Sequence, residues 1–527
     1  MVMRVMPDHT YDRMSLVAFL MLVVVLGLTF RDYGVTYDEV YRRAYGEHIL
    51  SYYASFFGDR SALSYRGLWH SPGLADLAAT VVAKLVPFGV YEGRHLFILF
   101  TGLLCIGGCW KVARLLGGPR AGFWSLIVVA LSPSFYGHLV NNPKDIPFAA
   151  AYVWSLYFIL QAVEHLPRIP TTLALKLGVA LGAALGTRIG GAVLVVYVLG
   201  GAAVWLTARL AVVRNARSVA SDAGRLASAC LPAALVAYAI MLVGWPTAHH
   251  APIGRPLKEL AFLTIFPWRH EVLFKGSLVE STELPWDYLP VHLLVKLPEL
   301  TLVSLMVGLV MIAVRGVRAE RTVQVRFVLV AAAAFTPVLY AAITRPVQYD
   351  EMRHFLFIIP PISCLAGTAI AATLALTDAH QHLRVALTAL VLAACALPVE
   401  VMVRLHPYQY VYYNSLVGGL RGAEGRYETD YWAHSYREAA LLLAQYVKAA
   451  GRDRVEATPY KVAIAGPEES VMYYLPAGFS PASDTTSADF YVSYTRWRSD
   501  QRVEGKVIAR VQRMGVTLSV VKDLRVP

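Results

Sequence analysis

The chain has 527 residues, of which 57% are hydrophobic and only 16% are charged, against about 25% charged residues in soluble domains. This composition excludes a disordered chain and a simple cytosolic enzyme, because hydrophobic cores in water stop growing near about 250 to 300 residues. The formal net charge is +12, but the basic residues gather in short segments between apolar runs, a distribution typical of membrane proteins and not of nucleic-acid-binding proteins.

Apolar runs long enough to cross a bilayer as helices, about 17 to 25 residues, occur along most of the chain. The first run follows Arg4 and Arg13 and has no small-residue cleavage site, so we expect an anchored span and not a removed signal peptide. The run 74–90 contains Asp76 and Lys84, and we interpret it as an interfacial helix. The eleven expected spans are 14–30, 94–115, 121–138, 146–163, 173–189, 190–208, 226–245, 299–314, 327–343, 355–376 and 385–403.

The positions of lysine and arginine predict the orientation of these spans. With 74–90 left out, the basic stretches fall on the same side as the amino terminus, and the positive-inside rule makes that side cytoplasmic. An odd number of spans then places the carboxy-terminal segment outside, together with two long loops, 31–93 and 246–298. The basic stretches are 111–120, 168–176, 209–225 and 315–326.

The segment 404–527 has the pattern of a small α/β domain. SYREAALLLAQYVKAA at 435–450 has helical periodicity, and KVAIA, DFYVSY, KVIARV and LSVVKDL predict short strands. We therefore expect a mainly α, polytopic membrane protein of about 11 transmembrane helices, made of a membrane module, 1–403, and a C-terminal extracytoplasmic α/β domain, 404–527.

Cysteine usage argues against a disulfide framework and a zinc site, because every cysteine falls inside an apolar run without metal-ligand spacing. We expect no cofactor, with a divalent metal left open. The cysteines are Cys105, Cys109, Cys230, Cys364 and Cys395.

Two adjacent carboxylates, Asp38 and Glu39, follow the first span within about ten residues. A carboxylate held at the membrane surface can take a proton from a nucleophile that attacks a lipid-linked substrate. The alternative is an ordinary solvated acidic pair. A general base is identified by its distance to the proton it removes, so the sequence leaves both interpretations open.

The second outer loop ends in NNPKDIPFA, which places Lys144 and Asp145 immediately before a span. Asp145 either caps the helix or positions an acceptor, and Lys144 can face a phosphate. Arg188 lies between two apolar runs near the outer boundary of the hydrocarbon region. An arginine there either snorkels to the interface or has an anionic partner.

Arg353 lies at the outer end of a late span, in RPVQYDEMRHFLFIIPP. Arginine is suited to bidentate phosphate binding, so the polar cluster around it can hold a phosphate leaving group. The competing interpretation is an ion pair with Asp350 or Glu351. The other members of the cluster are Arg345, Tyr349, Asp350 and His354.

Aromatic residues in the long outer loop include Trp286 and Tyr288. Such residues usually form the belt that anchors a protein at the membrane interface, but these two can instead stack on a sugar ring or line a lipid groove. The segment HPYQYVYYNSLVGG (406–419) is likewise either an aromatic anchor or a lid over the site.

Over about residues 14–404 the sequence resembles the polyprenyl-phosphate-dependent GT-C glycosyltransferases, the superfamily of the protein O-mannosyltransferases and the aminoarabinose transferases that modify lipid A. The motifs that carry the resemblance are YDE at 37–39, KDIPFA at 144–149, LPWDYLPVHLLVKLP at 284–298 and MRHFLFIIPP at 352–361. The tail sequence from 406 to 440 is similar to that of bacterial mannosyltransferase-like proteins.

The resemblance implies a bacterial inner-membrane enzyme that moves a sugar from a polyprenyl phosphate to an extracytoplasmic acceptor with inversion at the anomeric carbon. It implies Asp38 as general base, Glu39 and Asp145 as acceptor-positioning carboxylates, and Arg353 as the main phosphate contact, with Lys144 and Arg188 assisting. Relatives often carry Lys-Pro-Pro or His-Pro-Pro-Leu after the first loop, where this chain has WHSPGL with His70. The expected partners are the lipid-linked donor, the acceptor and membrane lipids, with no nucleic acid.

Two other functions compete with this one. A transporter or flippase for a lipid-linked saccharide usually places its charged residues near the membrane midplane, whereas here they gather at outer helix ends. A membrane-anchored assembly protein would need its tail and not Asp38.

Overall fold

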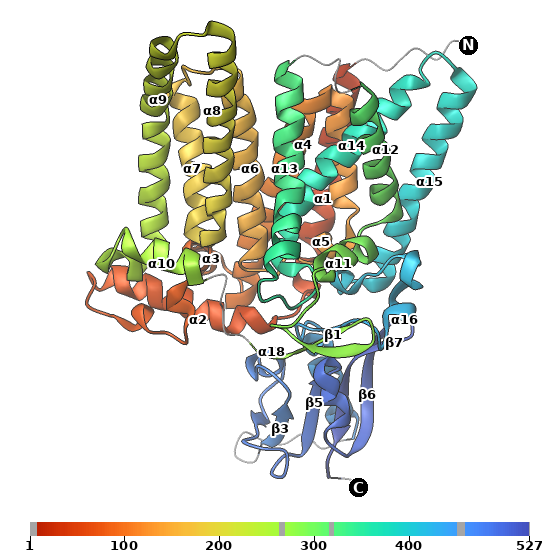
Figure 1. Cartoon of the computed structure of the whole chain (residues 1–527). Coiled ribbons are helices and arrows are strands. Elements are labelled where there is room, and N and C mark those ends of the chain that lie inside the picture. Colours follow the sequence, from red (N-terminus) through yellow and green to blue (C-terminus); the bar gives the residue numbers. More distant parts are fainter. Residues whose placement is uncertain (1–7, 263–268, 316–320, 451–458, 526–527) are drawn as a thin grey trace.

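A computed structural model describes residues 8–262, 269–315, 321–450 and 459–525. A bundle of helices forms the larger part, and a sheet domain lies at one end, away from the amino terminus (Figure 1). The helices that run along the bundle are α1 (Asp8–Thr29), α4 (Val90–Ala130), α6 (Asp145–Val163), α7 (Thr171–Thr187), α8 (Ala192–Val213), α9 (Ala216–Val243), α12 (Glu299–Arg315), α13 (Arg321–Thr344), α14 (Ile359–Leu376) and α15 (Gln381–Leu405).

Within the described residues, eight helical segments are long and apolar enough to cross a membrane, or nine if α12 forms a broken span with α11 (Tyr288–Lys296), from which it is bent by 113°. The chain is thus a multi-pass integral membrane protein. Each of the eleven expected segments is largely helical, but α7 has only 17 residues and α4 contains two of the expected segments. The basic stretch at 315–326 lies partly outside the described residues.

Helix α4 folds back on itself and accounts for two expected spans, 94–115 and 121–138. Gly117 and Gly118 leave the helical conformation, and Gly118 has φ of 78°, which a residue without a Cβ adopts without strain. Cys109 Sγ lies 3.8 Å from the carbonyl oxygen of Ser125, so the two arms are side by side. The Gly-Gly-Pro sequence therefore makes a tight helical hairpin.

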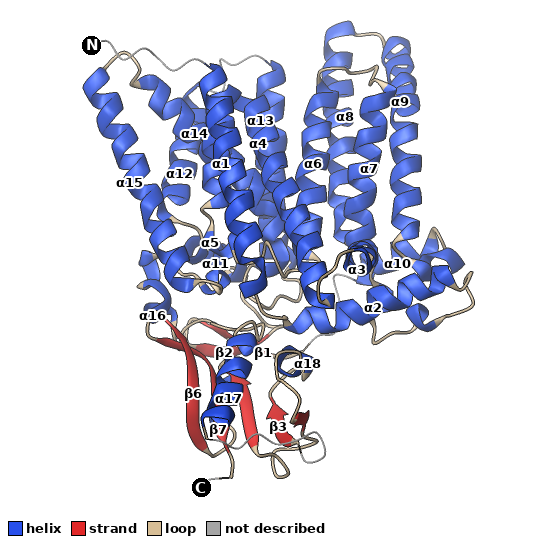
Figure 2. Ribbon diagram, turned by 180° about the vertical axis from the view of Figure 1, so that it is seen from behind, coloured by secondary structure: helices blue, strands red, loops and turns tan. Residues whose placement is uncertain are grey.

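Several short helices lie at the end of the bundle that faces the sheet domain. Helix α3 (Leu74–Leu85) has 12 residues and lies across the bundle axis (Figure 2). At about 1.5 Å per residue it is too short for a hydrocarbon layer of about 30 Å, which favours the interfacial interpretation of 74–90. The others are α2 (Tyr37–Ala54), α5 (Pro133–Tyr136), α10 (Gly254–Phe262) and α16 (Gly419–Ala423).

The tail folds into a five-stranded mixed sheet with the order β4-β3-β5-β7-β6. Strand β3 is parallel to β4 and β5, whereas β7 is antiparallel to β5 and β6. The predicted helix and four strands are confirmed, while β4 was not predicted. The elements are α17 (Tyr436–Ala449), β3 (Tyr460–Ile464), α18 (Glu469–Met472), β4 (Phe479–Pro481), β5 (Phe490–Tyr494), β6 (Lys506–Arg513) and β7 (Val516–Asp523).

A hairpin that the sequence analysis missed lies between the bundle and the sheet (Figure 1). Its strands, β1 (Glu271–Phe274) and β2 (Ser277–Glu280), are joined by Lys275 and Gly276, both with positive φ. Such a two-residue turn matches the twist of the strands it connects. The Gly276 N–H donates to the Arg426 carbonyl, 2.9 Å away, which ties the turn to the chain that leads into the sheet domain.

One hydrophobic core extends from the end of the bundle into the sheet domain. It contains side chains of the hairpin, of α11, of α17 and of the strands β3, β5 and β7. The aromatic segment 406–419 contributes Tyr408, Tyr410, Tyr412 and Tyr413, each at most 3% exposed. In this structure the segment therefore packs inside the junction and is neither an exposed anchor nor a lid.

Candidate active site

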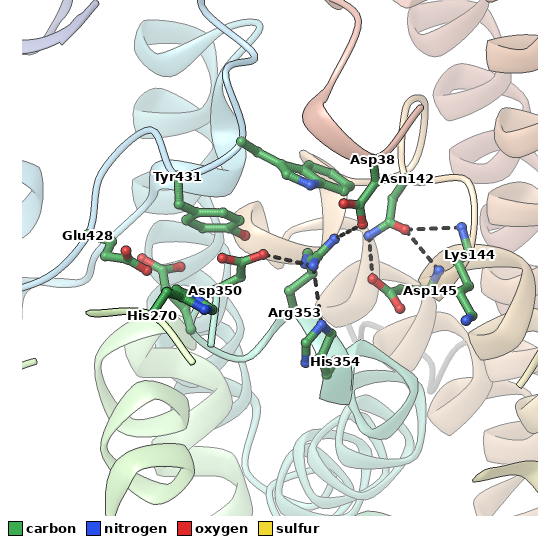
Figure 3. Close-up of polar contacts among 12 residues, drawn as sticks. Asp38, Asn142, Lys144, Asp145, His270, Asp350, Arg353, His354, Glu428 and Tyr431 are labelled. Carbon is green, nitrogen blue, oxygen red and sulfur yellow. Dashed lines mark hydrogen bonds and ion pairs between the residues drawn. The ribbon is translucent and has the colours of Figure 1, made fainter. Parts of the chain in front are cut away.

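A cluster of charged side chains lies where the bundle meets the sheet domain, and Figure 3 shows its polar contacts. Its members come from the start of α2, the loop before α6, the turn before α14 and the segment between α16 and the sheet. The cluster brings together Asp38, Asp145, Lys144, Arg188, Tyr349 and Arg353 of the residues expected from the sequence.

The adjacent residues Asp38 and Glu39 have different surroundings. Thr36 caps α2, and Glu39 completes a capping box by accepting hydrogen bonds from the Thr36 N–H (2.9 Å) and hydroxyl (3.1 Å). The other Glu39 oxygen lies 2.9 Å from Nε2 of His95 in α4. Glu39 is fully buried, and this geometry favours a structural role for it. Asp38 remains as the carboxylate that faces the cluster.

Asp38 forms an ion pair with Arg353 across more than three hundred residues of sequence. The Arg353 side chain is only 4% exposed, whereas that of Asp38 is 34% exposed. Burial alone would raise the pKa of Asp38, but the nearby Arg353 and Arg42 guanidiniums outweigh it and lower this pKa below its ordinary value. Asp38 is thus an ionised carboxylate that solvent or a substrate can reach.

Arg353 has a second carboxylate partner, Asp350, 2.7 Å away, as the sequence analysis allowed. Asp350 also lies 2.6 Å from Arg496, which follows β5 in the sheet domain. Arg496 in turn pairs with Glu428 at 3.2 Å. In Figure 3, Asp350 and Glu428 lie on the side of Arg353 opposite Asp38. A chain of alternating charges therefore connects the sheet domain to Asp38.

The turn before α14 sends two neighbouring carboxylates in different directions. Asp350 and Glu351 both have φ near 60°, a strained conformation for residues other than glycine. Glu351 consequently pairs with Lys296 of α11 at 2.5 Å and not with Arg353. The Tyr413 hydroxyl donates to the same carboxylate at 2.5 Å, and all three side chains are buried. This second ion pair holds the turn that carries Arg353.

Lys296→Met is expected to lower the stability of the folded protein by about 3 to 5 kcal/mol, because it leaves the Glu351 carboxylate buried without its cation. Thermal unfolding of the purified protein in detergent measures the change. The matched control is Lys275→Met, which breaks the more exposed Lys275–Asp287 pair and should change stability by about 0 to 1 kcal/mol. Equal effects of the two substitutions would show that the buried pair does not hold the turn.

Asn142 organises the loop that carries Lys144 and Asp145. Its side-chain oxygen accepts from the Asp145 N–H at 2.8 Å and the Lys144 N–H at 3.3 Å, and its amide donates to the Asp145 carboxylate at 3.0 Å. Asp145 also forms an ion pair with Arg188. Arg188 therefore has an anionic partner, as one of the two sequence interpretations required, and Asp145 is held at the start of α6.

The Lys144 ammonium differs from the other cations of the cluster. Among the described residues, no carboxylate forms an ion pair with it, and its hydrogen bonds are made by its backbone, with the Asn142 side chain and with the Phe148 N–H. Burial, together with the nearby Arg42 and Arg188 guanidiniums, lowers the pKa of Lys144 well below its ordinary value. A bound anion would relieve this unfavourable arrangement. Lys144 can therefore pair with a phosphate without giving up a carboxylate partner.

Three other expected site residues lie outside this cluster. His70 stacks on Trp69 with ring centroids 3.7 Å apart and contacts Glu259 of α10 at 2.8 Å. Trp286 is 58% exposed. Tyr288 is fully buried and its hydroxyl accepts from the Glu351 N–H at 3.0 Å, so it supports the turn and cannot stack on a sugar.

Sequence reasoning missed several members of the cluster. Asn142 was predictable, since asparagine side chains often accept hydrogen bonds from backbone N–H groups two residues further along a turn. The residues around Arg42 in the sequence do not indicate a site. Arg42 lies 3.1 Å from Asp76 of α3 only because the chain folds. The same holds for Arg496 and for Trp432, whose ring lies 4.8 Å from the Arg353 guanidinium.

Within the part of the chain that the structure describes, no group of three or more His, Cys, Asp or Glu side chains is arranged to hold a metal ion.

Comparison with known proteins places this geometry in context. Residues 70–221 match the sequence model of the dolichyl-phosphate-mannose-protein mannosyltransferase family. No curated protein sequence matches the chain significantly.

Solved structures share the fold over nearly the whole chain. ArnT from Cupriavidus metallidurans in the apo state has 16% sequence identity and a TM-score of 0.51, with 96% of this chain and 97% of ArnT covered. The same protein bound to undecaprenyl phosphate has 15% identity and a TM-score of 0.52 over the same shares. The oligosaccharyltransferase of Archaeoglobus fulgidus in the apo form has 14% identity and a TM-score of 0.52, covering 91% of this chain and 65% of that one.

These findings confirm the resemblance to polyprenyl-phosphate-dependent GT-C glycosyltransferases that was expected from the sequence. The family match covers part of the membrane module, and the shared fold extends through the sheet domain. The expected fold class, mainly helical with a small mixed-sheet domain at the carboxyl end, is confirmed as well.

Proposed function

We propose that the chain transfers a sugar from a polyprenyl-phosphate carrier to an acceptor on the outer side of the membrane, by a single displacement that inverts the anomeric carbon. The observation that carries the proposal is that one cluster at the end of the bundle holds a reachable carboxylate, Asp38, and a half-buried lysine, Lys144, for which the described residues supply no carboxylate partner. A transporter would more often place such groups near the membrane midplane.

The proposed step needs one base and a set of cations. Asp38 takes the proton of an acceptor hydroxyl or amine while that atom bonds to the anomeric carbon. The bond between this carbon and the phosphate oxygen breaks, and its electron pair leaves with the polyprenyl phosphate. Lys144 and Arg353 stabilise the negative charge that grows on the phosphate. Asp145, held by Asn142 and Arg188, positions the acceptor.

Phosphate binding also changes Asp38. Without a donor, Arg353 pairs with Asp38 and lowers its pKa, which makes it a weak base. A donor phosphate competes for the Arg353 guanidinium. The pKa of Asp38 then rises toward its ordinary value, so the base becomes stronger when the leaving group is in place.

The proposed donor is an undecaprenyl-type phosphate sugar and not a nucleotide sugar. ArnT, which shares the fold, was solved with undecaprenyl phosphate. The cluster lies at an end of the bundle that we assign to the outside, where nucleotide sugars are not supplied. Transfer from a radiolabelled nucleotide sugar by purified protein without any polyprenyl lipid would contradict this assignment.

Lys144→Gln is expected to weaken binding of undecaprenyl phosphate by about 10-fold or more, because it removes the cation that lacks a carboxylate partner. Lys144→Arg should keep most of the affinity. Binding of the lipid phosphate to purified protein provides the measurement, with Lys111→Gln, near Asp12 in the first turns of α1, as the control. Unchanged binding by Lys144→Gln would show that the phosphate binds to another part of the cluster.

For the topology, we propose a bacterial inner-membrane location with the amino terminus in the cytoplasm and the sheet domain in the periplasm. Single cysteines in a chain without native cysteines test this at exposed positions. Arg60→Cys and Ser483→Cys should react with an impermeant maleimide in cells whose outer membrane alone is opened, and Arg217→Cys only after the inner membrane is opened. Labelling of Ser483→Cys from the cytoplasmic side alone would refute the outer site.

A further inference from the structure

A cavity of about 420 Å³ lies at the junction of the hairpin and the sheet domain, apart from Asp38 and Lys144. Its walls come from the β1–β2 hairpin, the segment 424–430, the connection between β5 and β6, and the strands β6 and β7. Ligand sites are common at such junctions between domains. The hairpin precedes the last membrane helices, whereas the other walls belong to the tail. The cavity therefore exists only when the sheet domain packs against the hairpin.

The cavity wall combines aromatic rings with hydrogen-bonding groups. Tyr427 and Trp497 supply the rings, and the hydroxyls of Thr429 and Thr495 lie 3.0 Å apart. Glu428 is 6% exposed, and one of its carboxylate oxygens pairs with Arg496. Its other oxygen is buried without a hydrogen-bond partner. A buried carboxylate oxygen without a donor is costly, and Glu428 is one of the residues that line the cavity.

The position of Trp497 is fixed from several sides. Its indole N–H donates to the Glu271 carbonyl of β1 at 2.8 Å, and the Arg496 guanidinium lies 4.5 Å from its ring centroid. Trp497 and Arg498 both have positive φ, near 54°, a conformation that side chains rarely adopt. Strain of this kind persists where the surroundings hold a residue in place. Here the surroundings hold the Trp497 ring at the cavity wall.

Arg496 connects this wall to the reacting groups. It pairs with Glu428 in the cavity wall and with Asp350, and Asp350 contacts Arg353 (Figure 3). The cavity is therefore two ion pairs away from the arginine that contacts Asp38. Such a distance suits a part of the acceptor beyond the atom that reacts, and not the donor phosphate.

We propose that this cavity binds a saccharide unit of the acceptor, which rests on the proposed function. A sugar ring presents C–H groups to an aromatic face and neighbouring hydroxyls to a carboxylate and a guanidinium, and Trp497, Glu428 and Arg496 offer that combination. The acceptor is then a glycan or glycolipid, and the sheet domain selects it.

Full-length protein in a detergent without a sugar headgroup tests the proposal with three probes: mannotriose, maltotriose and chitotriose. At least one of them should bind, as measured by saturation-transfer NMR and titration. Trp497→Ala is expected to weaken that binding by about 10-fold, whereas Trp497→Phe, which keeps a ring but also loses the bond to Glu271, should change it by about threefold or less. Glu428→Gln, which is nearly isosteric, should weaken it by about 5-fold or more.

Phe56→Ala is the matched control, since this exposed aromatic residue does not line the cavity, and it should bind the trisaccharide as the parent protein does. Failure of all three probes to bind the parent, or unchanged binding by both Trp497→Ala and Glu428→Gln, would overturn the proposal. The measurement requires no donor and no turnover. Trisaccharide binding in a protein that does not bind undecaprenyl phosphate would support the cavity and refute the proposed function.

Discussion

Asp38→Asn is expected to lower the rate of sugar transfer by about 10²- to 10⁴-fold and to leave donor binding largely unchanged. The asparagine has nearly the same shape as the aspartate, but it cannot take a proton from the acceptor. Its loss of charge also frees Arg353 from one ion pair, so donor affinity should not fall. The measurements are transfer in membranes from a strain that supplies donor and acceptor, and binding of undecaprenyl phosphate to the purified variant.

The control for Asp38 is Asp32→Asn. Asp32 is also a carboxylate just after α1, but it pairs with His406 at 2.9 Å and is 47% exposed. We expect transfer close to that of the parent protein in this variant. Parent-level transfer by Asp38→Asn, with normal amounts of protein in the membrane, would remove Asp38 from the role of base.

Arg353→Ala is expected to reduce both donor affinity and turnover, with a loss of about 10²- to 10³-fold in turnover alone. On the proposed function, the guanidinium contacts the phosphate in the ground state and more strongly as the leaving-group charge grows. Its removal also leaves Asp38 and Asp350 without the cation between them. Arg353→Lys should retain part of the activity, since it keeps the charge and loses the planar fork.

The pH dependence of Arg353→Ala provides a second readout. Arg353 lowers the pKa of Asp38, so its loss raises that pKa. Because the base must be ionised, the residual transfer should fall off at a higher pH on the acid side than in the parent. The control is Arg404→Ala, which breaks an exposed pair with Glu400 at 2.9 Å. Unchanged donor binding and turnover in Arg353→Ala would leave Arg353 as a structural ion pair.

The elements of the fold could be predicted largely because apolar runs and periodicity are local signals. The strand KVAIA and the helix 435–450 needed only their own residues. The hairpin at 271–280 was missed although Lys-Gly between two short runs indicates a turn. The folding back at Gly117 and Gly118 explains why a single long helix accounts for two predicted spans.

The carboxylates and cations of the candidate site could be predicted because they lie at helix ends, but the ion pairs between them could not. Lys144 and Asp145 are neighbours, yet only the fold gives Asp145 a cation, Arg188, and leaves Lys144 without a carboxylate partner among the described residues. Glu39 was grouped with Asp38, whereas helix geometry makes it the residue that completes the capping box of Thr36 at the start of α2. Burial and distant partners decide these roles, and a sequence shows neither.

The hydrophobic core shared by the bundle end and the sheet domain has a consequence for biosynthesis. Arg496 is translated after every membrane helix, and it reaches Asp350 only when the sheet domain has folded against the hairpin. On the proposed topology, all membrane helices are synthesised and inserted before this domain emerges in the periplasm. In a newly inserted chain, Asp350 therefore has Arg353 as a partner but not yet Arg496. Secretion of the tail determines when the enzyme becomes complete.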